Sequence, residues 1–181
     1  MSREKTFKNR QNIIYSARGI NILNKILIMA NTYTQIHIQF VFAVKYRAAL
    51  IAPTWKEKLQ KYITGIFQSN DHKMLQINSM PDHIHILIGL RPLQSIASLI
   101  QIIKTDNNTW INKNCLTTSQ FAWQEGYGAF SYSRSDLPNV IRYIQNQEKH
   151  HAKRTFREEY LTLLNKFNVP HDARYVFKPI E

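Results

Sequence analysis

Hydrophobic spacing divides residues 34–89 into one helix and three strands. Residues 34–44 alternate apolar and polar side chains, which is typical of a strand with one face in the core and one polar face. Residues 55–67 carry apolar side chains at i, i+4, i+7, i+8, i+11 and i+12, which predicts an amphipathic helix. Residues 74–78 and 83–89 predict two further strands, joined by a tight Pro-Asp turn into a hairpin.

The second half of the chain continues with a helix, a strand and two more helices. The helix predicted after residues 91–92 has an inward face formed by Leu93, Ile96, Leu99, Ile100 and Ile103, extended by Trp110 and Ile111. Residues 121–133 predict a fourth strand with a Gly-Tyr-Gly bend, and residues 135–153 predict a helix with Pro in its first turn. Thr155 and Glu158 form a capping-box pattern that begins a last helix.

The order of these elements is β-α-β-β-α-β, followed by helices. This is the order of the ferredoxin-like, RRM-like split βαβ fold, an α+β class whose antiparallel sheet carries helices on one face. We therefore expect the other face of the sheet to be open, and His83 and His85 to lie on it. The C-terminal helices would add to this core.

The balance of charge points to a polyanionic partner. The 181 residues include 24 Lys and Arg against 12 Asp and Glu, a formal net charge of +12. A positive field of that size attracts nucleic acid by counterion release, although a basic protein without such a ligand is the alternative. The single cysteine, Cys115, excludes an internal disulfide and a cysteine-rich zinc site, so a cytoplasmic protein is expected.

The first 28 residues form a basic segment. They hold six basic residues and one acid, so they contribute +5 of the net +12 and leave +7 for residues 29–181. The apolar run at residues 20–30 contains Asn and Lys and is too short to span a bilayer, so no membrane attachment is expected. We expect residues 1–28 to be a disordered extension or to precede a natural start at Met29, and residues 29–181 to form a single domain. A basic arm on nucleic acid is the alternative role for the extension.

Two histidines on the third predicted strand are candidate metal ligands. His83 and His85 are two residues apart, so their imidazoles share one strand face, about 7 Å apart along the strand. Rotamers can bring both ring nitrogens onto one cation, because neutral imidazole is a common metal ligand. Two histidines on an alternating strand also occur by chance, so a further ligand is needed to define a site.

A tyrosine and a glutamine on the predicted helix 135–153 extend this pattern. Tyr143 and Gln147 are four residues apart and share one helical face, which His150 or His151 extends by another turn. A neutral amide oxygen ligates a hard cation without cancelling its charge, so His83, His85 and Gln147 form a candidate three-point site. A tyrosine at helical spacing is otherwise a packing residue, but other positions of this helix already supply an apolar stripe.

Tyrosine suits one reaction in particular, the cleavage of a phosphodiester. Attack by its phenolate leaves a 5′-phosphotyrosine and frees a 3′-hydroxyl, so the bond energy is kept for rejoining. The phenol pKa of about 10 opposes this reaction at neutral pH. A nearby divalent cation and basic groups favour the phenolate and stabilise the charge that develops on the phosphate.

Taken in order along the chain, these residues resemble a known family. His83-Ile84-His85 resembles the HUH motif, in which a hydrophobic residue separates two histidines. The segments 123–131 and 143–147, with the histidines at 150–151, are similar to the single-tyrosine transposases of the IS-200/605 insertion-sequence type. The resemblance extends over about residues 31–177, and the ordered set of motifs is highly specific.

The resemblance implies a specific activity and site. It implies that Tyr143 is the nucleophile, and that His83, His85 and Gln147 are ligands of Mg²⁺ or Mn²⁺. The implied activity cuts and rejoins single-stranded DNA with hairpins near the ends of an insertion sequence, without a water-hydrolysed intermediate. The implied assembly is a homodimer in the cytoplasm of a bacterium or archaeon, in which the tyrosine helix of one subunit can serve the HUH strand of the other.

Basic side chains across the chain are candidate contacts to DNA phosphates. The candidates are Lys45, Arg47, Arg91, Lys104, Arg134, Arg142, Lys149, Lys153 and Arg154. Tyr46 and Tyr132 are candidates for stacking on bases. Each basic residue alone is also explained by ordinary exposure to solvent, and His150 and His151 by capping of the C-terminal end of their helix.

Two other functions stay open at the level of the sequence. A related HUH nickase of replication or conjugation would use the same residues, although a chain of 181 residues is short for a large multifunctional member. The alternative from a different class is a domesticated or non-catalytic protein that binds hairpins or other nucleic acid on the same fold. An RRM-like binder would instead favour exposed aromatic side chains on its central strands.

Overall fold

A computed structural model describes residues 33–174 and residue 176 of the chain. The chain divides into two units, Met1–Tyr33 and Thr34–Glu181, and the fold below is that of the second unit. The predictions for residues 1–28 therefore lie outside the described residues. Within the described part of the chain, no helix is both long and apolar enough to cross a membrane.

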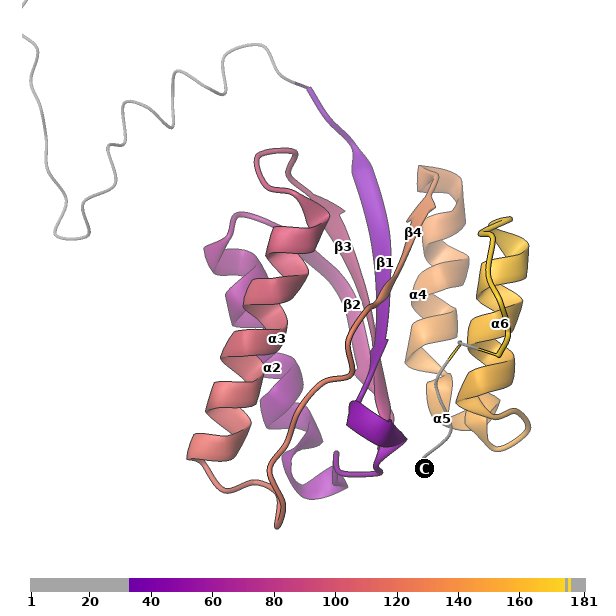
Figure 1. The fold of residues 1–181 in the computed structure, drawn as a ribbon. Coiled ribbons are helices and arrows are strands. Elements are labelled where there is room, and N and C mark those ends of the chain that lie inside the picture. The colour runs from indigo at the N-terminus through magenta and orange to yellow at the C-terminus, as the bar shows by residue number, and fades with distance from the viewer. Residues whose placement is uncertain (1–32, 175, 177–181) are drawn as a thin grey trace, which may run out of the picture. The chain divides into compact units, whose positions relative to one another are not determined.

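A four-stranded antiparallel sheet lies at the centre of this unit (Figure 1). Its strands are β1 (Ile36–Ala43), β2 (Lys73–Ser79), β3 (His83–Leu90) and β4 (Gly128–Tyr132), and the crossover helices are α2 (Pro53–Ser69) and α3 (Ile96–Lys113). The strands are hydrogen-bonded in the order β2-β3-β1-β4, with each neighbouring pair antiparallel. Because α2 connects β1 to β2 and α3 connects β3 to β4, this order confirms the ferredoxin-like split βαβ fold.

Helices α2 and α3 cover one face of the sheet and enclose the largest part of the core (Figure 1). Alternate residues of the two central strands point to this side, including Phe40 and Phe42 of β1 and Ile84 and Ile86 of β3, all of them buried. The apolar stripe of α2 meets them, as its spacing predicts. The alternation within residues 34–44 is thus confirmed as a strand pattern.

The start of α3 differs from its prediction. The helix begins at Ile96, because Ser95 is the N-cap and its side-chain oxygen accepts a hydrogen bond from the Ser98 amide at 3.2 Å. Leu93 precedes the helix and is 58% exposed, so the prediction that it faces inward is wrong. The serine cap, rather than the apolar spacing, decides where the helix starts.

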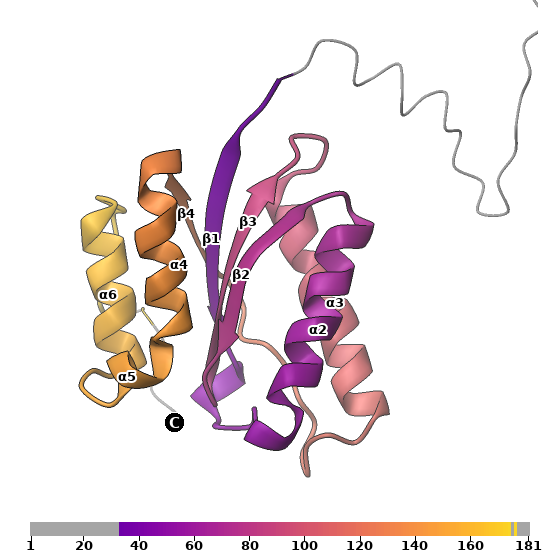
Figure 2. The same ribbon diagram turned by 180° about the vertical axis from the view of Figure 1, so that it is seen from behind.

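Three C-terminal helices cover the opposite face of the sheet, as Figures 1 and 2 show. They are α4 (Leu137–Gln145), α5 (Gln147–His151) and α6 (Phe156–Lys166). Val41 of β1 packs in one cluster with α6, and Leu87 of β3 packs with α4. The sheet face that carries His83 and His85 was expected to be open, but it is covered. Apolar residues such as Val41 and Leu87 lie among its polar ones, and burying them under the helices is favourable. His83 and His85 are 1% and 0% exposed beneath these helices.

The predicted fourth strand is shorter than its sequence pattern. Gly126 adopts a left-handed φ of 77°, and the segment before it is a loop that meets the end of β1 through an isolated bridge between Trp123 and Val44, the residue after the strand. The strand starts at Gly128, where a Cβ atom would lie 2.8 Å from the ring of Phe130. Glycine at this position therefore lets the chain approach the cluster under α6.

The helix predicted over residues 135–153 is interrupted. Asn146 (φ −94°, ψ 21°) separates α4 from α5. Two short 3₁₀ turns, η1 (Lys45–Arg47) and η2 (Arg134–Asp136), precede α2 and α4. The capping box of Thr155 and Glu158 is confirmed at the start of α6.

Candidate active site

The turn between β2 and β3 holds the first of the two histidines in place. The Val44 amide donates to the Asp82 carbonyl at 2.7 Å, and the Met80 amide donates to the His83 carbonyl at 2.9 Å. His83 and His85 leave β3 on the same side, as the strand period requires, and their ring centroids are 5.2 Å apart. Both imidazoles therefore face the C-terminal helices.

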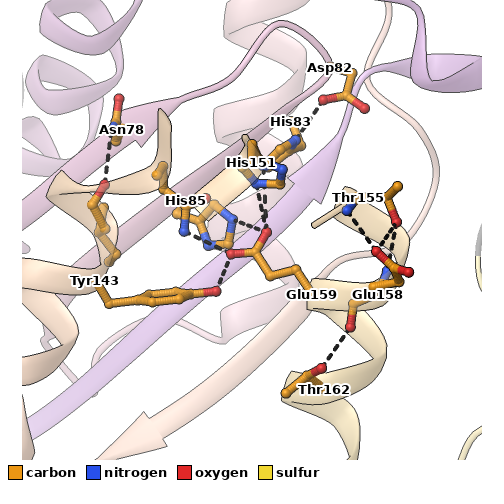
Figure 3. A network of polar contacts seen from close by, with 12 residues as sticks. Asn78, Asp82, His83, His85, Tyr143, His151, Thr155, Glu158, Glu159 and Thr162 are labelled. Atoms are coloured by element: carbon orange, nitrogen blue, oxygen red, sulfur yellow. Dashed lines mark hydrogen bonds and ion pairs between the residues drawn. The ribbon is translucent and has the colours of Figure 1, made fainter. Parts of the chain in front are cut away.

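Helix α4 brings Tyr143 over these histidines. Asn78 of β2 donates from its side-chain amide to the Ile144 carbonyl at 2.9 Å, which ties the end of α4 to the sheet (Figure 3). The ring centroid of Tyr143 lies 6.0 Å from that of His85, in an edge-on arrangement. The tyrosine and the histidine pair thus meet within one chain.

The carboxylate of Glu159, on α6, lies among three imidazoles (Figure 3). Its Oε2 atom is 2.9 Å from Nε2 of His151, 3.4 Å from Nε2 of His85 and 3.8 Å from Nε2 of His83. Glu159 is buried and comes from a different element than any of the histidines. The four side chains form one cluster, which we call the His–Glu cluster.

The other oxygen of Glu159 contacts the tyrosine and the glutamine identified in the sequence. Oε1 accepts a hydrogen bond from the Tyr143 hydroxyl and another from the Gln147 side-chain amide, the latter at 2.8 Å. Gln147 is fully buried, and the break at Asn146 does not separate it from Tyr143. The structure therefore brings the four residues of the predicted site, Tyr143, His83, His85 and Gln147, to one place.

The donor atoms of this site fit a divalent cation. Among the described residues, the buried polar atoms that make no hydrogen bond of good geometry include Nε2 of His83, His85 and His151, Oε1 of Gln147 and Oε2 of Glu159. Buried polar atoms of this kind are costly unless another group pairs with them. Imidazole nitrogens and amide or carboxylate oxygens are common ligands of divalent metals, so the residues present match such an ion.

The second ring nitrogens of His83 and His85 have partners of their own. Nδ1 of His83 lies 2.7 Å from the Asp82 carboxylate, which accepts its proton and leaves Nε2 as the ligating atom. Nδ1 of His85 lies 3.0 Å from the Gln39 side-chain nitrogen, and the Gln39 oxygen accepts a hydrogen bond from the Tyr132 hydroxyl at 2.9 Å. A half-turn of the Gln39 carboxamide places its oxygen next to Nδ1 of His85, where it accepts a hydrogen bond from a proton on Nδ1. In this tautomer of His85 the Nε2 atom carries no proton and can bind a metal.

Burial and mutual contacts shift the pKa values of the site in opposite directions. Burial raises the pKa of Tyr143, and the negative charge of Glu159 raises it further, so the phenol is protonated at neutral pH. Burial alone would raise the pKa of Glu159, but contacts with His151 and His85 outweigh it and hold that pKa well below its usual range. The Tyr143 hydroxyl therefore donates to a carboxylate that stays ionised.

Acid is expected to destabilise the metal-free protein through His83. Burial lowers the pKa of His83 from 6.5 to about 4, more than the contact with Asp82 raises it. Between these two pH values the unfolded chain binds a proton that the native chain does not, so the free energy of unfolding falls as the pH falls. The lowered pKa of His83 alone corresponds to a loss of about 3 kcal/mol in the free energy of unfolding between pH 6.5 and about pH 4. Urea unfolding at pH 6.5 and pH 4.5 in the presence of a chelator measures it.

The variant His83→Gln provides the comparison, because its side chain does not titrate. We expect a smaller loss of stability between the two pH values than in the unchanged protein. His151 acts in the opposite sense, since contact with Glu159 outweighs burial and raises its pKa, which favours the native state in acid. His151 is present in both the unchanged protein and His83→Gln, so its contribution is largely the same in the two. Equal losses of stability between the two pH values would therefore contradict the role of His83.

Three of the predicted DNA contacts gather in a hollow beside the His–Glu cluster. Arg47, Lys153 and Arg154 line this hollow together with Asp82 and His151. Arg47 also pairs with Asp82 at 3.6 Å, whereas Lys153 and Arg154 are exposed. Positive charge therefore lies next to the histidines, and the contact of these three residues with DNA stays a prediction.

Most of the other predicted DNA contacts are spread over the surface. The exposed ones are Lys45 on η1, Arg142 on α4, Lys149 on α5, and Arg91 and Arg134, which line a second hollow with His37. Of the two tyrosines predicted to stack on bases, Tyr46 is 62% exposed, whereas Tyr132 is half-buried and donates to Gln39. These contacts stay predictions.

Lys104 differs from the other basic candidates. Its ammonium donates to the Gln124 carbonyl at 2.7 Å and also to the Gly126 carbonyl. Burial lowers the pKa of Lys104 to about 8, against the opposite effect of Glu125. Lys104 thus holds the loop before β4, and its contact with DNA stays a prediction.

Sequence reasoning did not assign a metal-site role to His151 or Glu159. His151 lies one helical turn after Gln147, so its spacing is a signal that could have placed it beside the predicted ligands. Glu159 lies on the same helical face as Phe156 and Leu163, both buried, and an ionised side chain on an apolar face needs a partner. The identity of that partner depends on how α6 lies on the sheet.

A tyrosine that meets paired histidines on a ferredoxin-like sheet is the arrangement of a DNA-processing enzyme of the tyrosine type. Residues 32–147, more than half of the chain, match the family described as “Transposase IS200 like”. The chain therefore belongs to the IS200-like transposase family, as the resemblance of its motifs implies.

Individual relatives agree with this assignment. The ISDra2 transposase TnpA of Deinococcus radiodurans is 21% identical to the chain over 118 residues, which cover 62% of this chain and 84% of that protein. A crystal structure of a candidate transposase from Deinococcus radiodurans R1 matches with a TM-score of 0.52 and 19% identity, over 65% of this chain and 94% of that one. A REP-associated tyrosine transposase bound to a REP hairpin matches with a TM-score of 0.52 and 15% identity, over 79% of this chain and 90% of that one. At these identities the two structures confirm the fold.

Proposed function

We propose that this transposase cleaves and rejoins single-stranded DNA at insertion-sequence ends through Tyr143, with a divalent cation held by His83, His85 and Gln147. The observation that carries the proposal is the convergence of the Tyr143 hydroxyl, two histidine Nε2 atoms and the Gln147 carboxamide on one buried carboxylate. Residues from β3, α4 and α5 meet there although up to 64 positions separate them in sequence, from 83 to 147.

The proposed reaction transfers one phosphoester bond. The Tyr143 hydroxyl releases its proton to solvent as its oxygen forms a bond to the scissile phosphorus, the bond from phosphorus to the 3′-oxygen breaks, and the departing 3′-oxygen takes up a proton from solvent. The product is a 5′-phosphotyrosine, which the 3′-hydroxyl of another strand attacks to rejoin the DNA. When bound, Mg²⁺ or Mn²⁺ would favour the phenolate and offset the charge that develops on the phosphate.

The surroundings of Tyr143 support access for a DNA strand. A pocket of about 290 Å³ lies between α4 and α6, and Tyr143, Arg154 and Lys166 are among its lining residues. With Arg47 and Lys153 beside the histidines, basic side chains lie on two sides of the cluster. Single-stranded DNA with a hairpin is the substrate that we propose, since one structural relative is a tyrosine transposase bound to a REP hairpin.

The homodimer and the bacterial or archaeal cytoplasm stay part of this proposal. Because Tyr143 contacts Glu159 and lies beside His85 of its own chain, each subunit of such a dimer would hold a complete set of the proposed residues. The single cysteine, Cys115, is exposed and not part of the site, which suits a reducing compartment.

The test is the formation of a covalent adduct. Purified full-length protein is mixed with single-stranded oligonucleotides that copy the DNA on both sides of the reading frame, with Mn²⁺ or with a chelator. We expect an adduct on denaturing gels with Mn²⁺, none with the chelator, and a phosphotyrosine in the peptide that contains Tyr143. Hairpin binding that is indifferent to the chelator, without any adduct, would instead establish a non-catalytic binder.

A further inference from the structure

We propose that Glu159 and His151 bind the same divalent cation as His83 and His85, and that Glu159 links this cation to Tyr143. The inference rests on the proposed function, because it assumes a metal at the histidine pair. It adds two ligands to the site and makes α6 a part of it. Both residues lie after the segment 32–147 that matches the family.

The first argument is the spacing of the donor atoms. His83, His85, His151 and Glu159 each offer one ligand atom, and these four atoms all lie within 4.8 Å of one another. Ligand atoms that share a cation at about 2.0–2.3 Å are separated by at most about 4.6 Å, so a spacing of up to 4.8 Å is within a few tenths of an ångström of what a single ion needs. Only small side-chain adjustments are needed for all four to ligate it.

The second argument is that the donor atoms of Glu159, which is buried, and of His151, which is partly buried, are shielded from solvent and lack a hydrogen bond of good geometry to the residues that the structure describes. Glu159 is 7% exposed, and neither its Oε2 atom nor Nε2 of His151 makes a hydrogen bond of good geometry within the described part of the chain. His83 and His85, at 1% and 0% exposed, present their Nε2 atoms to the same point. A cation at that point would pair all of these atoms at once.

The third argument is that the two oxygens of Glu159 are used separately. Oε1 accepts from the Tyr143 hydroxyl and from Gln147, whereas Oε2 faces the three imidazoles. If Oε2 ligates the cation, Oε1 still holds the Tyr143 hydroxyl at a fixed place relative to it. Glu159 is therefore both a ligand and the residue that positions the nucleophile.

The orientation of α6 supports this assignment. The capping box of Thr155 and Glu158 fixes the first turn of the helix, and Phe156 and Leu163 anchor its apolar face on the sheet. Glu159 lies between these anchors and so points toward β3. Its neighbour Glu158 is exposed and serves the cap instead.

The proposed ligand set has a preference that can be measured. Three imidazoles with one carboxylate favour transition metals over Mg²⁺, which prefers oxygen ligands. We therefore expect Mn²⁺ to bind at least about tenfold more tightly than Mg²⁺. Loss of the third imidazole should reduce this preference.

The experiment is a calorimetric titration of metal-free, full-length protein with Mn²⁺, in the absence of DNA. The test variants are Glu159→Gln and His151→Ala, and the matched controls are Glu148→Gln and His150→Ala, exposed residues of α5 next to the site. We expect each test variant to bind Mn²⁺ at least about tenfold more weakly and each control to stay within about twofold. Pulsed EPR of the Mn²⁺-loaded protein should show three imidazole nitrogens, and two in His151→Ala.

The outcomes separate this inference from the proposed function. If Glu159→Gln and His151→Ala bind Mn²⁺ normally while His85→Ala does not, the cation uses His83, His85 and Gln147 alone, and the inference is overturned. If His85→Ala also binds normally, the metal site of the proposed function fails as well. Should Glu159→Gln not fold, Glu159→Asp keeps the charge and withdraws the oxygen by one methylene, so normal Mn²⁺ affinity in it would overturn the inference.

Discussion

Tyr143→Phe is expected to abolish the covalent protein–DNA adduct, with cleavage reduced by at least about 10³-fold. The phenyl ring has no oxygen to attack the phosphorus. Every other proposed residue of the site is left in place. Denaturing gels of the Mn²⁺ reaction with the flanking-DNA oligonucleotides measure the effect.

The same variant should fold and bind DNA almost normally. It loses the hydrogen bond from its hydroxyl to Glu159, but Oε1 of Glu159 still accepts from Gln147 at 2.8 Å. The expected cost in the free energy of unfolding is about 1 kcal/mol. Hairpin affinity should change little, because the aromatic ring and the basic side chains beside the site are all retained.

Tyr62→Phe is the matched control for this experiment. Tyr62 is also half-buried on a helix, but it stacks on Trp110 at 4.7 Å between centroids, in the core on the opposite face of the sheet. It should retain full cleavage. Adduct formation by Tyr143→Phe at the rate of Tyr62→Phe would show that a different nucleophile attacks the DNA.

The fold was predictable where the hydrophobic period continues without interruption. The alternation in β1 and β3 and the stripe of α2 depend on local spacing, and the structure confirms them. The cover over the other face was not predictable in this way, because its apolar residues, Val41 and Leu87, are single positions among polar ones and give no periodic signal of their own. Whether such a face is open depends on which distant helices return to it.

The site shows the same division between local and long-range information. His83 and His85 are placed by the period of one strand, and Tyr143 and Gln147 by one turn of helix, so spacing identified each pair. The meeting of the two pairs depends on contacts such as that of Asn78 with the Ile144 carbonyl. Glu159 enters from a third element, and no spacing within the chain relates it to β3.

Asn146 shows why a boundary can be wrong while the site is right. Its φ and ψ of −94° and 21° end α4, although the apolar and polar spacing continues through it. The chain resumes a helical turn at Gln147, so Gln147 still reaches the carboxylate that Tyr143 contacts. The side chains therefore converge even though the backbone is not one continuous helix.

His85→Ala is expected to remove the dependence of cleavage on metal together with most of the cleavage itself. His85 supplies a fully buried Nε2 atom on the proposed cation, and alanine has no donor to replace it. A metal that stabilises transition-state charge contributes several kcal/mol, so cleavage should fall by roughly 10²–10³-fold. Mn²⁺ should also no longer raise the unfolding temperature of the protein, because binding to the native state is lost.

His37→Ala is the control that separates a metal site from a general effect of losing a histidine. His37 lies on β1, half-buried, and lines the second hollow with Arg91 and Arg134 rather than the His–Glu cluster. It should keep both the cleavage and the stabilisation by Mn²⁺. If His85→Ala matches it in both measurements, the His85 imidazole is structural, and both the cleavage and the stabilisation by Mn²⁺ depend on other residues. If His85→Ala loses both while still binding hairpin DNA, binding and chemistry are separate functions of one sheet, and the buried histidines serve the chemistry.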